Sequence, residues 1–214
     1  MNPEMEKTLE ERVEETIDEQ LEKLEDFFGM ELKRPTVTLL NSRAEMDLLY
    51  GHQTEPWLVG NTNPKTGEIS ILREDRYETD SSHRREEFWG TLKHEIVHAA
   101  QGKIKEGEYR PVWFEEGVCQ YLADQKKEGT PTEDLAKVNQ FFEYQKNETR
   151  FYGVGYFWVK HLAEKYGDEK ISQLVKLIKP GITPEKFQEN FEKIYGFKLD
   201  DEYIKRTSEE KKSD

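Results

Sequence analysis

Hydrophobic residues near the start of the chain recur at steps of three and four, which is the spacing of one face of an α-helix. Acidic residues fill most positions between them, so residues 4–28 are predicted to form an amphipathic helix, with Asn2 and Pro3 suited to its N-cap and first turn. In the simpler interpretation, the acidic face of this helix is exposed to solvent and its apolar face packs against the core. In the alternative, the helix is a lid that covers a cleft. The apolar positions are Met5, Leu9, Val13, Ile17, Leu21, Leu24, Phe27 and Phe28.

The pattern changes after residue 34, where β-branched residues gather in short runs. The run "PTVTLL" (35–40) predicts a strand, and "SRAEMDLLYG" (42–51) predicts a short helix that Gly51 closes. The segment "WLVGNTNPKTGEISIL" (57–72) is typical of two strands joined by a turn-rich loop. These elements together predict a small, mostly antiparallel N-terminal sheet.

Helical periodicity dominates the rest of the chain, so we expect an α+β fold in which a helical C-terminal lobe follows the sheet. We expect residues 1–30 to form the acidic helix and residues 31–206 one domain with lobes at about 31–103 and 104–206, before a disordered tail at 207–214. The expected helices run from Ser81 or Ser82 to Gln101, from about 111 to 128, and over 132–147, 151–166, 169–179, 183–194 and 200–206.

The composition of the chain limits the classes of partner that such a domain can bind. The formal net charge is −13 and the pI is near 5.0, which opposes binding to nucleic acid or to anionic membranes because both are polyanions. The nine-residue run "FYGVGYFWV" (151–159) is too short to cross a bilayer. The first residues lack the features of a secretory signal, and the single cysteine, Cys119, fits a reducing compartment, so a cytoplasmic location is expected.

The stretch "TLKHEIVHAAQG" (91–102) carries the clearest candidate chemistry. His94 and His98 are four residues apart, so a helix places both imidazoles on one face, where they can bind one Zn²⁺ ion per chain. Glu95 lies between them, and its carboxylate can reach a metal-bound water without being a ligand. Roughly 0.02 occurrences of this motif are expected by chance at this composition, and the alternative is a helix with two surface histidines.

A second motif, "WFEEGVCQY" (113–121), supplies glutamates on the next predicted helix. The pair H-E-x-x-H and W-x-x-E-G resembles the gluzincin metallopeptidases, the group of thermolysin-like and aminopeptidase-N-like enzymes. The resemblance implies a zincin-like fold, Glu116 as the third zinc ligand, and Glu95 as the base of peptide hydrolysis. Gly117 would let two helices approach closely around the ion. Cys119 is expected to pack in the core.

The same resemblance implies roles for residues around the metal. Gln120 takes the place of an acid that hydrogen-bonds one zinc-bound histidine in the family, so it is expected beside the ligands. Tyr152 in "YGVGY" (152–156) matches the tyrosine that stabilises the oxyanion in aminopeptidase-N-like members, with Tyr156 as the alternative.

The strand "EISIL" (68–72) corresponds to the edge strand that pairs with substrate in the gluzincins. Ile69, Ser70 and Ile71 would then offer their backbone to an extended peptide. The alternative is an interior strand.

These features predict a zinc-dependent peptidase that acts on peptide or protein substrates. No G-x-M-E-N segment is present to hold a free amine, so an endopeptidase is expected rather than an exopeptidase. Three alternatives stay open: a zinc-stabilised interaction module without turnover, a latent proenzyme whose cleft the N-terminal helix covers, and a factor that cleaves nucleic-acid-bound substrates, which the charge opposes.

Overall fold

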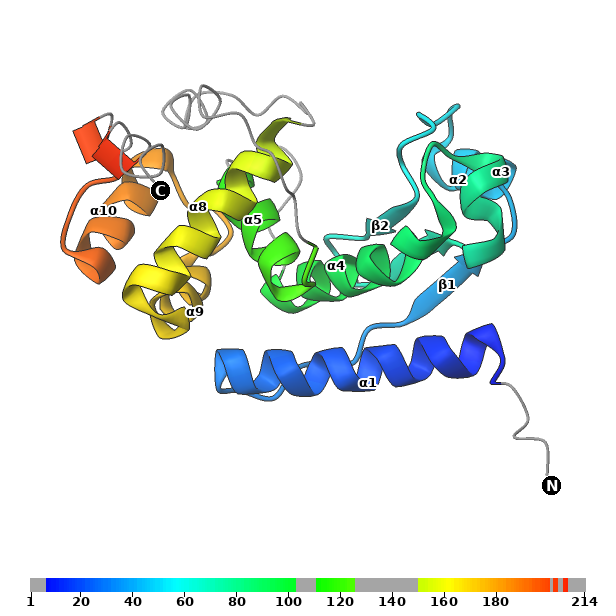
Figure 1. The fold of residues 1–214 in the computed structure, drawn as a ribbon, viewed down its shortest axis with the longest axis horizontal. Coiled ribbons are helices and arrows are strands. Elements are labelled where there is room, and N and C mark those ends of the chain that lie inside the picture. Colours follow the sequence, from blue (N-terminus) through cyan, green and yellow to red (C-terminus); the bar gives the residue numbers. More distant parts are fainter. Residues whose placement is uncertain (1–6, 103–110, 126–149, 201, 204–205, 208–214) are drawn as a thin grey trace.

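The computed structural model describes residues 7–102, 111–125, 150–200, 202–203 and 206–207, and it describes the side chains of α8 from residue 153 onward. A three-stranded sheet with short helices forms one end of an elongated molecule, and a cluster of helices forms the other (Figure 1). The long helices α1 and α4 lie side by side and connect the two ends. This architecture confirms the α+β class.

The helices and strands follow the chain in a simple order, and most lie where the hydrophobic pattern predicts them. The elements are α1 (Leu9–Phe28), β1 (Val37–Leu40), α2 (Arg43–Tyr50), β2 (Gly60–Thr62), β3 (Ile69–Leu72), η1 (Glu74–Arg76), α3 (Tyr77–Asp80), η2 (Arg85–Glu87), α4 (Phe88–Gln101), α5 (Val112–Leu122), α8 (Arg150–Tyr166), α9 (Asp168–Leu177) and α10 (Pro184–Tyr195). The helix expected at 132–147 lies outside the described residues. No helix among the described residues is long and apolar enough to cross a membrane.

The sheet has the order β1-β3-β2, so β3 is its central strand. β1 pairs with β3 in parallel and β2 pairs with it in antiparallel register, so only one of the two pairings has the expected antiparallel sense. The expectation that Ile69, Ser70 and Ile71 form a free edge is therefore wrong. Both edges of β3 are already paired, and the side chains of Ile69 and Ile71 are fully buried. The free edge beside α4 belongs to β2.

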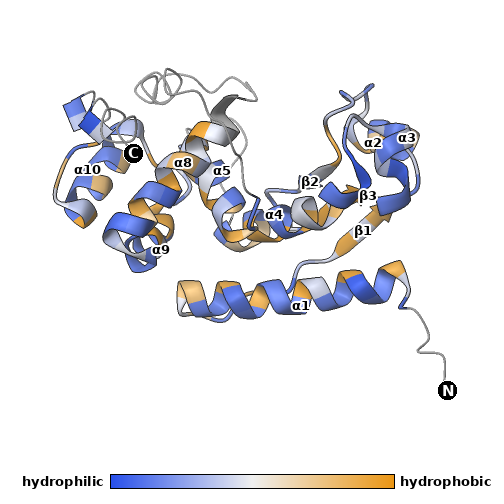
Figure 2. Cartoon of the chain, viewed as in Figure 1, coloured by the Kyte–Doolittle hydropathy of each residue, from blue (hydrophilic) through white to orange (hydrophobic). Residues whose placement is uncertain are grey.

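α1 begins later than expected, at Leu9, because Thr8 and Glu11 form a capping box. The Thr8 hydroxyl accepts a hydrogen bond from the Glu11 amide, and the Glu11 carboxylate accepts one from the Thr8 amide. Apolar and polar residues alternate along the helix as in a helix with one buried face (Figure 2). The buried positions include Val13, Ile17, Leu24 and Phe28, which belong to the main hydrophobic core.

Among the described residues, α1 packs against the side of α4 that faces away from His94 and His98. The Arg12 guanidinium lies 4.3 Å from the ring centre of Trp89 on α4. At 100° per residue, Trp89 is about 140° around the helix from His94 and about 180° from His98. The lid interpretation of the acidic helix is thus contradicted, because its apolar stripe is committed to the core on the far side of α4.

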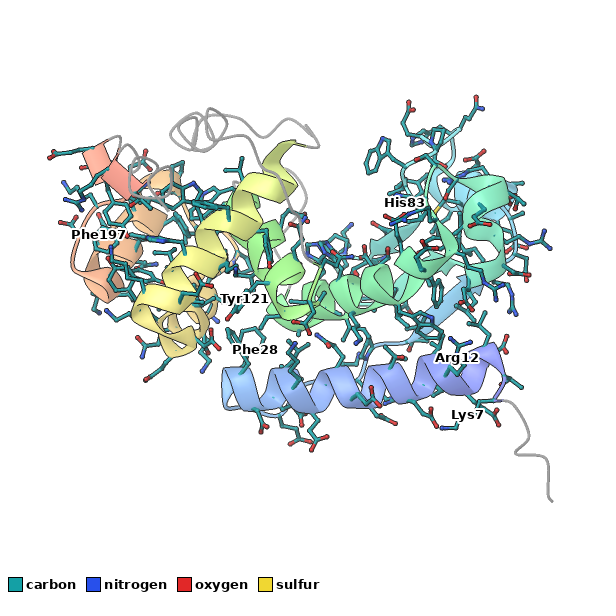
Figure 3. All side chains as sticks on the ribbon, in the orientation of Figure 1. Lys7, Arg12, Phe28, His83, Tyr121 and Phe197 are labelled. Carbon is teal, nitrogen blue, oxygen red and sulfur yellow. The ribbon has the colours of Figure 1, made fainter. Side chains whose placement is uncertain are left out.

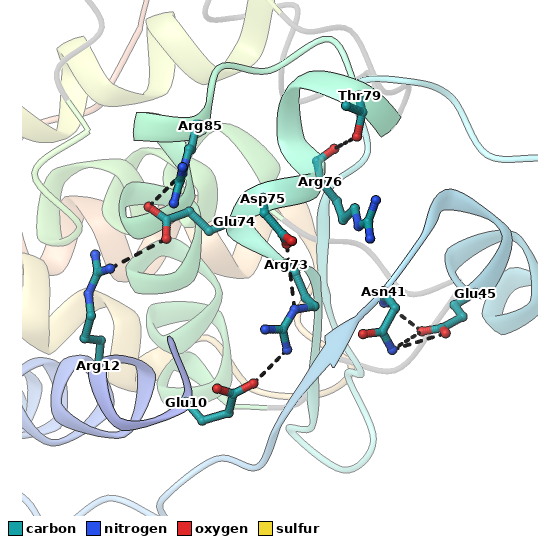
Figure 4. A network of polar contacts seen from close by, with 10 residues as sticks. All are labelled: Glu10, Arg12, Asn41, Glu45, Arg73, Glu74, Asp75, Arg76, Thr79 and Arg85. Atoms are coloured by element: carbon teal, nitrogen blue, oxygen red, sulfur yellow. Dashed lines mark hydrogen bonds and ion pairs between the residues drawn. The ribbon is translucent and has the colours of Figure 1, made fainter. Parts of the chain in front are cut away.

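Charged side chains fix the first turns of α1 to the segment after β3 (Figure 4). The Arg73 guanidinium is 2.7 Å from the Glu10 carboxylate, and Arg12 and Arg85 lie 3.7 and 3.5 Å from Glu74. Glu74 is largely buried, with a side chain 13% exposed, so its two cationic neighbours offset the cost of burying its charge.

α5 and α8 cross at very close range because both helices carry glycine at the contact. A Cβ added to Gly117 would lie 2.3 Å from the carbonyl oxygen of Gly155, and one added to Gly155 would lie 2.2 Å from that of Trp113. The close approach expected at Gly117 is present, but its partner is α8 and not the histidine helix. The backbone next to Glu116 is thereby held against a rigid neighbour.

Candidate metal centre

α4 brings the two histidines of the H-E-x-x-H motif together. The helix runs from Phe88 to Gln101 without interruption, so His94 and His98 lie one turn apart on the same face. Their Nε2 atoms are 3.1 Å apart. His94 is nearly buried, and the His98 side chain is 17% exposed, so the pair faces a space with limited access to solvent.

α5 adds a carboxylate to the same point. The Oε2 atom of Glu116 lies 3.2 Å from His94 Nε2 and 3.4 Å from His98 Nε2. The three atoms thus form a nearly equilateral triangle. Tetrahedral zinc with ligand bonds of 2.0 to 2.1 Å has ligand atoms about 3.3 Å apart. The donor set and its spacing therefore fit a zinc ion with one open position, which is the arrangement of a catalytic site.

Burial and neighbouring groups shift the pKa values of Glu116 and His98. Burial opposes ionisation of Glu116, but the charge of His98 and hydrogen bonds from both histidines outweigh it and hold the pKa of this carboxyl well below its usual range. Burial also disfavours a charged His98, yet Cys119 and Glu116 beside it raise the pKa of this imidazole well above its usual value. A metal ion that binds here must displace the shared proton.

Cys119 is a fourth potential ligand near the histidines. Its sulfur and one nitrogen from each of His94 and His98 lie within 4.8 Å of one another. Burial raises the pKa of the thiol to about 11. The carboxylate of Glu116 lies 3.2 and 3.4 Å from the two Nε2 atoms, and the Cys119 thiol becomes a strong ligand once a metal displaces its proton. Glu116 and Cys119 are thus both candidates for the third ligand.

Glu95 faces the edge strand β2. Its Oε2 atom accepts a hydrogen bond of 2.7 Å from the Thr62 hydroxyl, and the residue is only 8% exposed. Gly60 makes this proximity possible, because a Cβ there would lie 3.2 Å from Glu95 Cγ and 3.1 Å from Thr91 Cγ2. Thr62 orients one carboxylate oxygen, and no hydrogen bond to Oε1 occurs within the described part of the chain.

Gln125, and not Gln120, is the glutamine beside a histidine. Its Oε1 atom lies 3.0 Å from His94 Nδ1 and accepts the proton of that nitrogen. The expected role of Gln120 is not met, because its Oε1 atom is buried and has no hydrogen-bond partner among the described residues. Helical spacing places Gln120 one turn after Glu116, but α5 ends at Leu122 and the chain turns back toward α4, which delivers Gln125 instead.

The tyrosine candidates are only partly described. Tyr152 lies in the first turn of α8, but its side chain is outside the described residues. Tyr156 is half-buried on the same helix, next to the Gly155 that contacts Gly117. Sequence reasoning missed two polar neighbours, Thr62 and Gln125. Thr62 belongs to a predicted strand, but nothing local to either residue signals its contact with α4.

A surface groove among the described residues lies away from this centre. Its volume is about 830 Å³, and it is lined by the end of α1, the end of α5 and the start of α9, including Lys23, Phe28, Tyr121 and Asp168. It includes none of the proposed metal ligands. Size alone therefore does not locate the chemistry, which rests on the convergence of His94, His98 and Glu116.

Comparison with known protein families gives a match over most of the chain. A family model described as Collagenase matches residues 47–205, which is more than half of the 214-residue chain and includes both motifs. No curated protein and no solved structure matches the chain.

Proposed function

The chain belongs to the collagenase family of zinc metallopeptidases, and from this premise we propose that it is an endopeptidase whose zinc ion is held by His94, His98 and Glu116. The observation that carries the proposal is the triangle of Nε2, Nε2 and Oε2 atoms with edges of 3.1, 3.2 and 3.4 Å. The three groups come from two helices, so the fold and not local sequence creates the site. A zinc ion there supplies Lewis acidity, which polarises a carbonyl and lowers the pKa of a water.

Glu95 is the proposed proton carrier. Its hydrogen bond from Thr62 fixes Oε2, which leaves Oε1 to accept a proton from the attacking water and to deliver it to the leaving nitrogen. Burial excludes bulk water that would compete for this proton. Because Thr62 belongs to β2, its hydrogen bond to Glu95 also fixes the position of this carboxylate relative to a peptide that would pair with β2.

β2 is the proposed strand for substrate pairing. Backbone hydrogen bonds join Leu72 to Val59 and Asn63 to Glu68, so the bonded pairs alternate along the antiparallel register. The N–H and C=O groups of Gly60 and Thr62 then point away from β3, toward the free edge. An extended peptide can add to this edge beside Glu95 by β-augmentation.

The oxyanion residue stays a proposal that rests on the Y-x-x-G resemblance. Tyr152 is the candidate and Tyr156 the alternative. Both lie within about one turn of Gly155, and Gly155 contacts the residue that follows Glu116. The start of α8 is thus near the helix that supplies the third ligand.

The decisive experiment is mass-spectrometric profiling of a peptide library with the zinc-loaded protein and its Glu95→Gln variant at equal zinc content. Cleavage should fall by about 100-fold or more in the variant, because general acid–base catalysis is removed while the ligands remain. Glu164→Gln, at an exposed position of α8, is the matched control and should cleave like the wild type. Equal cleavage by Glu95→Gln would contradict the mechanism, and no cleavage by the wild type would favour a binding module.

A further inference from the structure

Gln125 meets His94 at the nitrogen that faces away from the proposed metal. The contact between Gln125 Oε1 and His94 Nδ1 is 3.0 Å, and His94 Nε2 points to Glu116. A side chain that accepts the Nδ1 proton fixes the tautomer in which Nε2 has a free lone pair for the metal. The same contact also fixes the rotation of the imidazole ring.

The surface of α4 has a gap that accommodates this glutamine. Gly90 lies one turn before His94, and a Cβ at that position would be 3.3 Å from both Cγ and Nε2 of Gln125. The side chain of Gln125 therefore lies across the bare backbone of Gly90 on its way to His94. A larger residue at position 90 would compete with it for this space.

The turn that presents Gln125 has a defined hydrogen-bond pattern. The Gln125 amide donates to the carbonyl of Gln120 (3.0 Å), and the Asp124 amide donates to that of Tyr121 (3.3 Å), as in a Schellman motif. Asp124 takes the left-handed conformation, with φ of 54°, that glycine usually provides at this position. An aspartate there carries a conformational cost, so the turn benefits from outside support.

α1 provides that support. The Gln20 side-chain amide donates to the carbonyl of Leu122 (3.1 Å), and the Lys23 ammonium donates to the same carbonyl (2.8 Å). Lys23 also pairs with the Asp124 carboxylate at 3.0 Å. Gln20 is only 3% exposed, so its hydrogen bond is a buried one. The end of α1 lies under the end of α5, as the labelled Phe28 and Tyr121 show (Figure 3).

We infer that Gln125 is a positioning residue for His94 and that Gln20 and Lys23 of α1 hold its turn in place. The contacts form a continuous path from α1 through Leu122 and Asp124 to Gln125 and His94. The N-terminal helix thus affects metal affinity from the side of α4 opposite to the site. The inference rests on the proposed function only in taking His94 as a metal ligand.

The first test measures zinc affinity by competition with a chromophoric chelator, without substrate. Gln125→Met keeps the length of the side chain but cannot accept the Nδ1 proton, and zinc should bind about 10- to 100-fold more weakly. Gln125→Glu restores an acceptor oxygen and should bind zinc at least as tightly as the wild type. Gln173→Met is the control, because Gln173 is exposed on α9 and bonds only to Glu169 among the described residues.

A second readout is the nitrogen-15 NMR spectrum of the histidines in the zinc-loaded protein. The Nδ1 proton of His94 should exchange slowly with solvent in the wild type and in Gln125→Glu, and rapidly in Gln125→Met. A merely structural role for Gln125 would not alter this exchange. Unchanged zinc affinity together with unchanged exchange in Gln125→Met would overturn the inference.

The support from α1 is tested by Gln20→Leu and Lys23→Met. Gln20→Leu removes one hydrogen bond to the turn, Lys23→Met removes one hydrogen bond and one ion pair, and each should weaken zinc binding by about 2- to 10-fold. Lys7→Met, at the other end of α1, removes only the exposed contact with Glu15 and should have no effect. Wild-type affinity in both Gln20→Leu and Lys23→Met would refute the role of α1. Because no step measures cleavage, these results stand apart from the failure or success of the peptidase proposal.

Discussion

The region around the candidate metal centre and the C-terminal helices bury different kinds of side chains. Around α4 and α5, His94, Glu95, Glu116 and Gln120 are all buried within a few turns of one another. Around α9 and α10, the buried side chains are mainly apolar: α9 buries aliphatic residues, and α10 buries aromatic rings, with Phe191 stacked on Tyr195 at 4.5 Å. Burying charges costs free energy that only good partners offset, whereas burying rings stabilises directly. The comparison predicts that the helical lobe contributes more to stability than the polar region does, and that a bound metal would stabilise the polar region.

The largest effect on stability is expected in the lobe. Phe191→Ala removes a fully buried ring and should lower the free energy of unfolding by about 3 to 5 kcal/mol. Zinc affinity should stay the same, since Phe191 contacts no ligand. Denaturant titration and chelator competition measure the two quantities. Leu177→Ala, at a position 40% exposed, is the control and should change stability little. A parallel loss of zinc affinity in Phe191→Ala would show that the two regions are not independent.

Zinc binding should stabilise the region around α4 and α5. Free zinc at about 100 times its dissociation constant should raise the free energy of unfolding by about 2.7 kcal/mol, because only the folded chain assembles the three ligands. Thermal denaturation with and without zinc measures this gain. His98→Ala should lack most of it, while Glu95→Gln should retain it. An equal gain in His98→Ala would place the zinc elsewhere in the protein.

The crossing of α5 and α8 connects the two regions, so a change there should affect both. Gly117→Ala places a Cβ 2.3 Å from the Gly155 carbonyl oxygen and should cost about 1 to 3 kcal/mol of stability. It should also weaken zinc binding, because Glu116 is the preceding residue. Gly155→Ala tests the same contact from the other helix. Wild-type stability in both variants, measured by denaturant titration, would refute the close contact.

Local patterns predicted the elements well where side chains next to one another in sequence decide the structure. Ser42 and Gly51 do begin and end α2, and Gly102 ends α4, because capping depends on a few adjacent residues. The two histidines of α4 were predictable for the same reason. Glu116 required a resemblance, since its distance from the histidines depends on how two helices pack.

The errors concern contacts between distant segments. The expectation of an edge position for β3 is wrong: its apolar residues, interrupted only by Ser70, are also compatible with an interior strand, and its pairing with β1 decides the matter. The resemblance predicts Gln120 beside the ligands, but the left-handed turn at Asp124 brings Gln125 to His94 instead, and this turn lacks the glycine that usually signals one. The sequence predicts the apolar stripe of α1, yet which surface covers this stripe is a property of the whole fold.

β1 has a consequence for any shortened version of the protein. The family match begins at residue 47, after both α1 and β1. A chain cut at that boundary would expose the β1-facing edge of β3, a strand whose residues Ile69, Ile71 and Leu72 are fully buried in the intact protein. An uncovered apolar strand edge pairs readily with other chains. Such a fragment would be prone to aggregation, so residues 37–40 act as its built-in protection.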